Sequence, residues 1–143
     1  ILYRTHGHSP ELIPGLSSCI AGPAAAMIPV THRGVADRLM VITAHGKANA
    51  VPDLPPFLPS CTYVFMMGVG RLQSITDGLV DNQAFPPSLP TPIVQEAWQP
   101  GQRAVYGTLG TISAIATAAG VKAPAVIVVG DVSAAGLLAG NRV

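Results

Sequence analysis

The stretch VTHRG, residues 30–34, places a hydroxyl, an imidazole and a guanidinium side by side after an Ala-rich segment with almost no charge. By residue chemistry alone this is an ambiguous polar patch, in which Thr31 and His32 can act as helix caps. Arg33 suits an exposed surface or a contact between subunits. His32 is more typical of a structural histidine, and the whole trio can equally be the polar end of a helix.

Other catalytic signatures are scarce. The four histidines are scattered, the acidic residues do not cluster, and the sequence has no Walker loop, GxGxxG, GxSxG or HExxH pattern. The GVG of residues 68–70 lacks the third glycine of a dinucleotide-binding loop. Cys19 and Cys61 are far apart and form no CxxC pair, so we expect two buried, reduced thiols and no metal site.

Charge and hydropathy exclude two classes of partner. Eight Lys and Arg against seven Asp and Glu give a formal charge of +1, which offers no basic surface to nucleic acid or to a membrane. Pro, Gly or polar residues interrupt every apolar run well before the ~20 residues of a membrane-spanning helix. We therefore expect a soluble protein, and the two reduced cysteines favour the cytoplasm as its location. Because the chain starts at Ile1, we also expect a fragment or a processed product.

The elements that must position these residues follow from apolar periodicity. Helices are predicted where apolar residues recur every three or four positions, and strands where short β-branched or aromatic runs are bounded by Pro, Gly or polar residues. The predicted helices are 16–28, 71–82 and 110–120, and the predicted strands are 11–15 (the end of one), 38–43, 61–68, 92–98, 103–109 and 123–130. Alternating strands and helices indicate an α/β fold, and strand pairs without an intervening helix favour a mixed sheet.

The first of these helices has a cap and a possible break. Ser17 or Ser18 is placed to cap it, and Pro23 is tolerated in a first turn but can also break the helix. The other two helices each have an apolar face at helical spacing. These faces comprise Leu72, Ile75 and Leu79 in the second helix and Ile112, Ile115 and Ala119 in the third.

Small or turn-forming residues end several of the predicted strands, at Pro14-Gly15, Gly68, Ala97 and Gly130. In an open α/β sheet a ligand binds beyond the strand ends, where Gly and Ala let backbone groups approach closely. The alternative is that these residues only form turns, and their spacing alone favours that alternative.

Five stretches, in order along the chain, resemble the tetrapyrrole methylase family, and within it the branch that methylates uroporphyrinogen III on carbon. They are LIPGLSS, AAAMIPVTHRG, YVFMMG, PTPIVQEAWQPGQRAVYGTL and APAVIVVGDVS. The resemblance implies a mixed sheet flanked by helices, in an enzyme with S-adenosylmethionine between two α/β domains. Residues 1–15 then correspond to the end of the first domain and residues 16–143 to the second. The family's GxGPG and GGDP loops and its acid/base residues have no counterpart in this chain, so its catalytic residues are unknown.

The resemblance also implies a set of cofactor-binding residues, which are Ser17, Ser18, Met67, Ala97, Thr108 and Leu109. Their hydroxyls and backbone groups suit the methionine carboxylate, ribose and adenine of the cofactor. Alternatives remain open, because the two serines can be helix caps and Met67 can simply fill the core. The match departs from the family at Met66, where the family has an aromatic residue, and at Ala44, where it has glycine. The acidic Glu96 is shifted by one position and receives no catalytic role.

Function follows from the same resemblance. It implies two successive C-methylations of uroporphyrinogen III to precorrin-2, in siroheme or cobalamin synthesis, by a homodimer, with Arg33 binding substrate carboxylates. One alternative is a non-catalytic α/β half that acts as a binding or dimerisation module. Another is a methylase of a different corrin intermediate, of RNA or of a protein residue; the near-neutral charge argues against RNA.

Overall fold

A computed structural model of the chain describes residues 2–45 and 53–134. At its centre is a five-stranded sheet in the order β1-β2-β5-β3-β4. The strands are β1 (Arg38–Thr43), β2 (Cys61–Met66), β3 (Ile93–Gln95), β4 (Arg103–Val105) and β5 (Ala125–Val129). β1 and β2 are parallel and the other three neighbouring pairs are antiparallel, which confirms the predicted mixed sheet.

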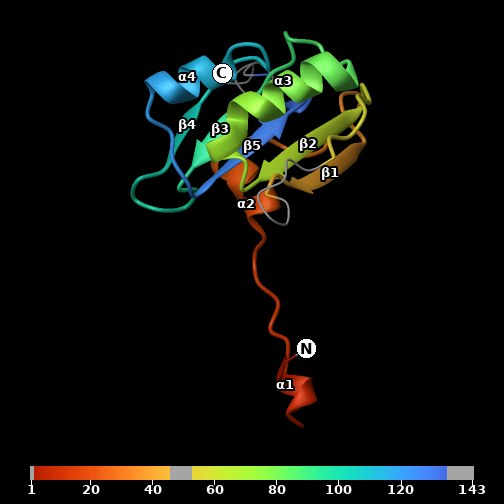
Figure 1. Ribbon diagram of the computed structural model, residues 1–143, viewed down its shortest axis with the longest axis vertical. Helices are drawn as coiled ribbons and strands as arrows, with labels where there is room; N and C mark the ends of the chain where they lie inside the picture. Colours follow the sequence, from red (N-terminus) through yellow and green to blue (C-terminus); the bar gives the residue numbers. More distant parts are fainter. Residues whose placement is uncertain (1, 46–52, 135–143) are drawn as a thin grey trace.

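Helices cover both faces of this sheet, so the fold has three layers. α3 (Leu72–Gln83) and α4 (Ile112–Ala118) pack on one face, where Tyr63 and Phe65 of β2 are buried. α2 (Ser18–Ala25) lies on the other face, against Val64 and the neighbouring valines of β5. Figure 1 shows α3 crossing in front of β2 and β5, with α2 at the lower edge. Because successive strand residues point to opposite faces, two separate cores form.

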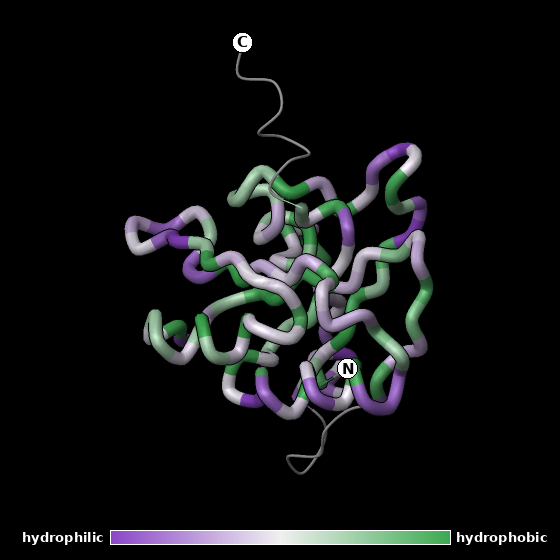
Figure 2. The backbone as a smooth tube through the Cα atoms, turned by 90° about the horizontal axis from the view of Figure 1, so that it is seen from above, coloured by the Kyte–Doolittle hydropathy of each residue, from purple (hydrophilic) through white to green (hydrophobic). Residues whose placement is uncertain are grey.

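The buried residues of α3 are those predicted from the sequence, whereas those of α4 differ in part from the prediction. Leu72, Ile75 and Leu79 are all buried in α3. In α4 the buried residues are Ile112 and Ala116, while Ile115 is 36% exposed and Ala119 lies beyond the helix end. The helix has only seven residues, and Ile112 and Ala116, four apart, form its inward stripe. Figure 2 shows hydrophobic stretches through the interior and hydrophilic ones in the outlying turns.

The N-terminal segment does not contain the predicted strand end. α1 (Leu2–Thr5) is followed by an extended arm that projects away from the sheet (Figure 1). The prediction of a strand end at 11–15 is therefore wrong for the described structure. Pro14 has no N–H for a strand ladder, and no described strand lies beside the segment. Leu12, Ile13 and Leu16 are consequently 90%, 82% and 94% exposed.

The buried hydroxyl of Tyr63 holds the loop before β2. The Tyr63 hydroxyl donates to the Pro56 carbonyl at 2.9 Å and accepts from the Leu58 N–H at 2.8 Å. Burial of this hydroxyl raises the pKa of Tyr63 to about 12, because the phenolate form loses its hydration. Both cysteines are free, with Cys61 buried as predicted and Cys19 only half-buried.

Candidate functional site

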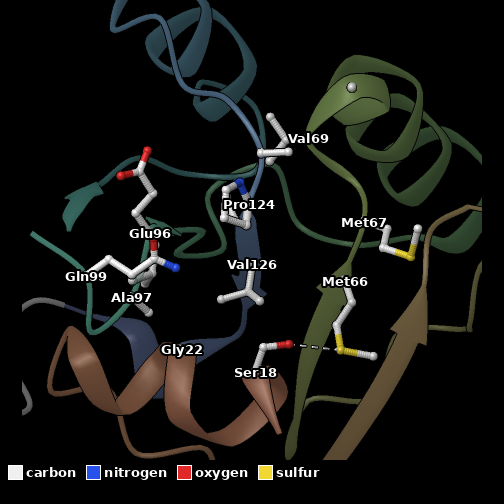
Figure 3. Close-up of a pocket in the computed structure, with 14 residues that line it drawn as sticks. Ser18, Gly22, Met66, Met67, Val69, Glu96, Ala97, Gln99, Pro124 and Val126 are labelled. Carbon is white, nitrogen blue, oxygen red and sulfur yellow. Dashed lines mark hydrogen bonds between the residues drawn. The ribbon is translucent and has the colours of Figure 1, made fainter. Parts of the chain in front are cut away.

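A cavity of about 630 Å³ opens at the edge of the sheet where β2 and β3 end and β5 begins (Figure 3). This edge gathers four segments because β5 runs antiparallel to both of its neighbours. Its walls include residues of α2, of the end of β2, of the loop after β3 and of the start of β5. Representative residues are Ser18, Gly22, Met66, Met67, Glu96, Ala97, Gln99, Pro124 and Val126.

The wall after β2 turns sharply at Met67. This residue has a left-handed backbone with φ of 58° and leaves its side chain 65% exposed at the cavity. Gly68 then enters the core, where a Cβ would lie 2.9 Å from Ile127 Cδ1 and 3.1 Å from Ala44 Cβ. The close approach explains why glycine follows Met67, because any side chain would push the strand end out of the core.

The wall formed by α2 begins with two serines that behave differently. Ser18 lines the cavity, and its hydroxyl donates to Met66 Sδ at 3.5 Å. Ser17 is the N-cap residue, as one of the two predicted alternatives has it, but its hydroxyl makes no capping hydrogen bond. The Ser17 hydroxyl oxygen lies 3.0 Å from Cys19 Sγ instead. Pro23 sits in the second turn of α2, later than the first-turn position considered from the sequence.

The loop between β3 and β4 forms the wall opposite Met67. Glu96 and Trp98, which flank Ala97, both have left-handed backbones with φ of 49° and 64°. Such conformations cost a non-glycine residue about 1–3 kcal/mol each, so the surrounding contacts must hold them. The Glu96 N–H donates to the Pro124 carbonyl at 2.9 Å, and the Trp98 N–H donates to Gln102 Oε1 at 2.7 Å.

A polar network lies beneath this loop. Gln95 is buried, and its Oε1 accepts from Arg103 Nη2 at 3.0 Å and from the Lys122 N–H at 2.9 Å. Its Nε2 donates to the Glu96 carboxylate at 2.9 Å. Arg103 also donates to the Ala119 carbonyl at the end of α4. The network therefore extends from Arg103 and Lys122 through Gln95 to the Glu96 carboxylate at the cavity.

The C-terminal end of α2 is joined to the same loop. The Ile28 N–H donates to the Pro23 carbonyl and the Met27 N–H to the Ala24 carbonyl, a Schellman motif with Met27 at φ of 56°. This arrangement leaves the Ala25 carbonyl without a donor from the helix end. Gln102 Nε2 donates to it at 3.0 Å.

The chemistry of the cavity is that of a largely uncharged site. Of the residues that line it in the described part of the chain, Glu96 alone is ionisable. The remaining lining combines small residues, valines and methionine thioethers with the Ser18 hydroxyl and the Gln99 amide. Such a lining suits a ligand with apolar and neutral polar parts, and it offers no cation to a polyanion.

Arg33 lies in a separate turn. The His32 N–H donates to the Ala36 carbonyl at 2.9 Å, and Gly34 has φ of 79°. His32 Nδ1 lies 2.9 Å from the Arg33 carbonyl oxygen, a contact that suits the structural interpretation of this histidine. Arg33 is exposed and is not among the residues that line the cavity.

Three of the predicted cofactor-binding residues also lie outside the cavity lining. Leu109 is buried in the core beneath α3 and α4, and its N–H donates to the Leu89 carbonyl. The N–H of Thr108 donates to Thr111 Oγ1 at 2.9 Å. The third is Ser17. The structure thus brings together Ser18, Met67 and Ala97 of the predicted set.

Of the predicted strand-end residues, Gly130 lies at the edge of the sheet opposite the cavity. Gly130 follows β5, and because β5 is antiparallel to β2 it lies against Cys61 and Thr62 at the start of that strand. Pro14-Gly15 belongs to the exposed arm. Gly68 and Ala97 are therefore the only two of these positions that meet at the cavity edge, within the residues described.

Sequence reasoning missed Gly22, Trp98 and Gln102. A Cβ at Gly22 would lie 2.5 Å from Val126 Cγ2, so this helical glycine lets α2 approach β5. The signal was a glycine and a proline inside an Ala-rich helix. Trp98 is the single tryptophan of the chain and Gln102 follows four residues later, but no local pattern links them to α2.

A metal-binding cluster and a membrane-spanning helix are both absent from the described part of the chain. Residues 2–45 and 53–134 contain no group of three or more His, Cys, Asp or Glu that could hold a metal ion. Within the same ranges, no helix is both long enough and apolar enough to cross a membrane.

Comparison with known proteins gives a consistent result. Residues 1–113 match the family model of tetrapyrrole (corrin/porphyrin) methylases. The chain is 39% identical over 109 residues to a probable uroporphyrinogen-III C-methyltransferase of Schizosaccharomyces pombe, covering 76% of this chain and 22% of that protein. It is 38% identical over 132 residues to the uroporphyrinogen-III C-methyltransferase of Methanocaldococcus jannaschii, covering 90% of this chain and 54% of that protein.

Solved structures give the same relationship. The uroporphyrin-III C-methyl transferase of Thermus thermophilus, in complex with S-adenyl homocysteine, superposes with a TM-score of 0.75 at 32% identity, covering 91% of this chain and 56% of that one. The chain therefore spans from about a fifth to about half the length of these relatives. The sequence match, the mixed α/β sheet and the superposition establish that the chain belongs to the tetrapyrrole (corrin/porphyrin) methylase family.

Proposed function

We propose that the cavity binds S-adenosylmethionine, and that the chain supplies this part of the site in an enzyme that methylates uroporphyrinogen III to precorrin-2. The observation that carries the proposal is the convergence of Ser18, Met67 and Ala97 on one cavity, from three separate segments. The relatives named above carry this activity in their names, and one of them is bound to S-adenyl homocysteine.

The lining fits such a cofactor. Valine, alanine and proline surfaces suit an adenine ring, and the small side chain of Ala97 leaves room for its close approach. The Ser18 hydroxyl, which donates only to a thioether, is free to rotate toward a stronger acceptor such as a ribose or carboxylate oxygen. Met67 projects a polarisable sulfur at the cavity entrance, where it suits an aromatic or sulfonium group.

The chemical demands on the protein are small. S-adenosylmethionine supplies a methyl group that its sulfonium has already activated. What the chain's residues must do is fix the ligand in line with the acceptor carbon and exclude water. Val94 and Val126 contribute the dry wall that excludes water, and the loop carrying Ala97 fixes the position of that wall.

Substrate binding requires a different surface. Uroporphyrinogen III carries eight carboxylates, which the nearly uncharged cavity does not accommodate. We infer that Arg33, exposed in its own turn, binds one of these carboxylates through paired hydrogen bonds. Residues 1–15 then represent the end of a first domain and residues 16–143 a second one. Of the second, residues 46–52 and 135–143 lie outside the described structure.

The exposed arm favours an additional role in association. Leu12, Ile13 and Leu16 present apolar side chains to solvent, a pattern typical of a segment that packs against another domain or subunit. We infer that the partner is a second copy of the chain, so that the enzyme is a homodimer, and that its two free cysteines suit the reducing cytoplasm. Siroheme and cobalamin are the two end products that the family resemblance implies. A different corrin intermediate as acceptor is the main alternative substrate.

Calorimetric titration with S-adenosylhomocysteine tests the proposal. Ala97→Leu fills the cavity wall and should weaken binding at least about tenfold, the effect of roughly 1.4 kcal/mol. Ala118→Leu, an exposed position at the end of α4, is the matched control and should leave binding unchanged. Binding to a longer gene product but not to the 143-residue chain would mean that the chain holds only half of the site. Absence of binding to both would refute the proposal.

A further inference from the structure

The two walls that meet at Ala97 are distant in sequence but directly bonded. Trp98 Nε1 donates to the Ala21 carbonyl of α2 at 2.7 Å, and Gln102 Nε2 donates to the Ala25 carbonyl at 3.0 Å. Each of these hydrogen bonds spans 77 residues. Figure 3 shows the segment carrying Glu96 and Ala97 above the helix that carries Gly22 and Ser18.

One of the two acceptors, the Ala25 carbonyl, is a group that α2 leaves without a helical partner, while the Ala21 carbonyl lies within the helix and accepts the indole N–H as an additional donor. The Ala25 carbonyl would pair with the N–H of residue 29 in a continuing helix, but residue 29 is proline and has none. The helix has already turned away at Met27. Ala21 lies one turn earlier on the same side of the helix, so one rigid loop can reach both carbonyls.

The loop is arranged to make these contacts together. Gln102 uses both ends of its amide: its Oε1 accepts from the Trp98 N–H at 2.7 Å while its Nε2 donates to Ala25. That hydrogen bond holds Trp98 in its left-handed conformation, with φ of 64°, and so aims the indole at α2. Ala97, the residue that lines the cavity, lies between two left-handed residues and cannot shift without disturbing them.

We propose that Trp98 and Gln102 are positioning residues, which set the width of the cavity by fixing α2 against the loop that carries Ala97. The inference rests on the proposed function, because it assigns these residues to the S-adenosylmethionine site. Neither side chain lines the cavity itself; they act through Ser18 and Gly22 on one wall and Ala97 on the other.

The same geometry supplies a direct reporter. Trp98 is the only tryptophan, and its indole is 69% exposed while its N–H is hydrogen-bonded to α2. Its emission therefore depends on both solvent contact and the hydrogen bond to Ala21. Filling the cavity next to it should change the intrinsic tryptophan fluorescence of the 143-residue chain, which contains no other indole.

The test compares three variants in whichever form of the protein binds S-adenosylhomocysteine. Gln102→Met removes both amide hydrogen bonds at nearly constant volume, and Gln102→Glu keeps the acceptor for Trp98 but loses the donor to Ala25. Gln83→Met, at the end of α3, is the control. We expect the dissociation constant to rise about threefold to tenfold in Gln102→Met, as one or two net hydrogen bonds predict, and less in Gln102→Glu. Gln83→Met should bind as wild type does.

A purely structural role gives a different result. If Gln102→Met lowers the melting temperature but the folded protein binds with an unchanged dissociation constant and an unchanged ligand-induced shift in Trp98 emission, the positioning role is wrong. Gln102→Glu keeps the test decisive if Gln102→Met does not fold. Failure of the wild-type protein to bind would instead overturn the proposed function, and with it the assignment of Trp98 and Gln102 to that site.

Discussion

Gly22 of α2 lies so close to Val126 of β5 that a Cβ on the glycine would be 2.5 Å from the valine Cγ2. Val126 is buried and β-branched, so it cannot rotate away freely. Both residues line the cavity. The distance between helix and sheet at the candidate cofactor site is therefore set by the absence of one methyl group.

A double-mutant cycle tests this contact. Gly22→Ala should destabilise the fold by about 1–2 kcal/mol, because overpacking at this site outweighs the gain of up to about 1 kcal/mol that alanine brings to a helix. In a Val126→Ala background the same change should stabilise by about 0.5–1 kcal/mol, since the clash is gone. Urea unfolding of the four proteins measures both values. An effect of Gly22→Ala of equal size in both backgrounds would show that the two side chains do not compete for space.

The helix end at Met27 predicts a stabilising substitution. Met27 occupies the left-handed position of the Schellman motif, with φ of 56° and a side chain that is 65% exposed. Met27→Gly should raise the free energy of unfolding by about 1 kcal/mol, because glycine adopts this conformation without the steric cost of a Cβ. Met27→Ala is the control, since it removes the same side chain but keeps the Cβ. Equal stabilities of the two variants would contradict the explanation.

The raised pKa of Tyr63 predicts that the folded protein loses stability at alkaline pH. Its pKa is raised from 10.0 to about 12 by burial, so the folded state favours the protonated hydroxyl more strongly than the unfolded state does. The stabilising contribution is complete below pH 10 and falls as the pH rises from 10 toward 12. Urea unfolding between pH 8 and 11.5 measures this loss. In Tyr63→Phe the slope of stability against pH should be smaller over the same window; an identical slope would exclude Tyr63 as its source.

Replacing Arg103 by lysine should lower the stability of the fold, although the charge of the side chain is unchanged. Its guanidinium donates to the Ala119 and Gly120 carbonyls at the end of α4 and to Gln95, at distances of 2.8–3.3 Å. A lysine ammonium cannot reach all three groups, so Arg103→Lys should cost about 1–2 kcal/mol of stability. Arg38→Lys is the control, because that side chain is exposed and only pairs with Asp37 at 3.5 Å. Thermal unfolding of both variants gives the comparison, and equal losses would refute the capping role.

Local patterns account for what the sequence predicts correctly. The spacing of Leu72, Ile75 and Leu79 requires only that one helix face be buried, and the apolar run ending at Val129 requires only a strand. Both features depend on neighbouring residues, and both are confirmed. The strand end expected at 11–15 fails because a strand also needs a partner, which no local pattern supplies.

The site is predicted less completely for the same reason. Motif resemblance marks Ser18, Met67 and Ala97, but which of the marked residues share one cavity depends on β5 being antiparallel. That direction also carries Gly130 to the opposite edge. The hydrogen bonds from Trp98 and Gln102 to α2 join residues 77 positions apart, and no periodic pattern in the sequence predicts them.

The place of β5 in the sheet has a consequence for how the protein is made. Of the five strands in the described sheet, β5 is the last to leave the ribosome, yet it lies between β2 and β3 and joins the two halves of the sheet. Until Ala125–Val129 has emerged, the β1-β2 pair and the β3-β4 pair each present an open hydrogen-bonding edge, and Tyr63 and Phe65 lack their neighbours on β5. Synthesis proceeds from the N-terminus, so the nascent chain exposes the free edge of β2 from the time β2 is made, and the free edge of β3 as well once β3 and β4 have followed. Ribosomes stalled before the codon for Ala125 should hold a chain that proteases cleave readily and chaperones bind, and release of the chain with β5 complete should end both effects together.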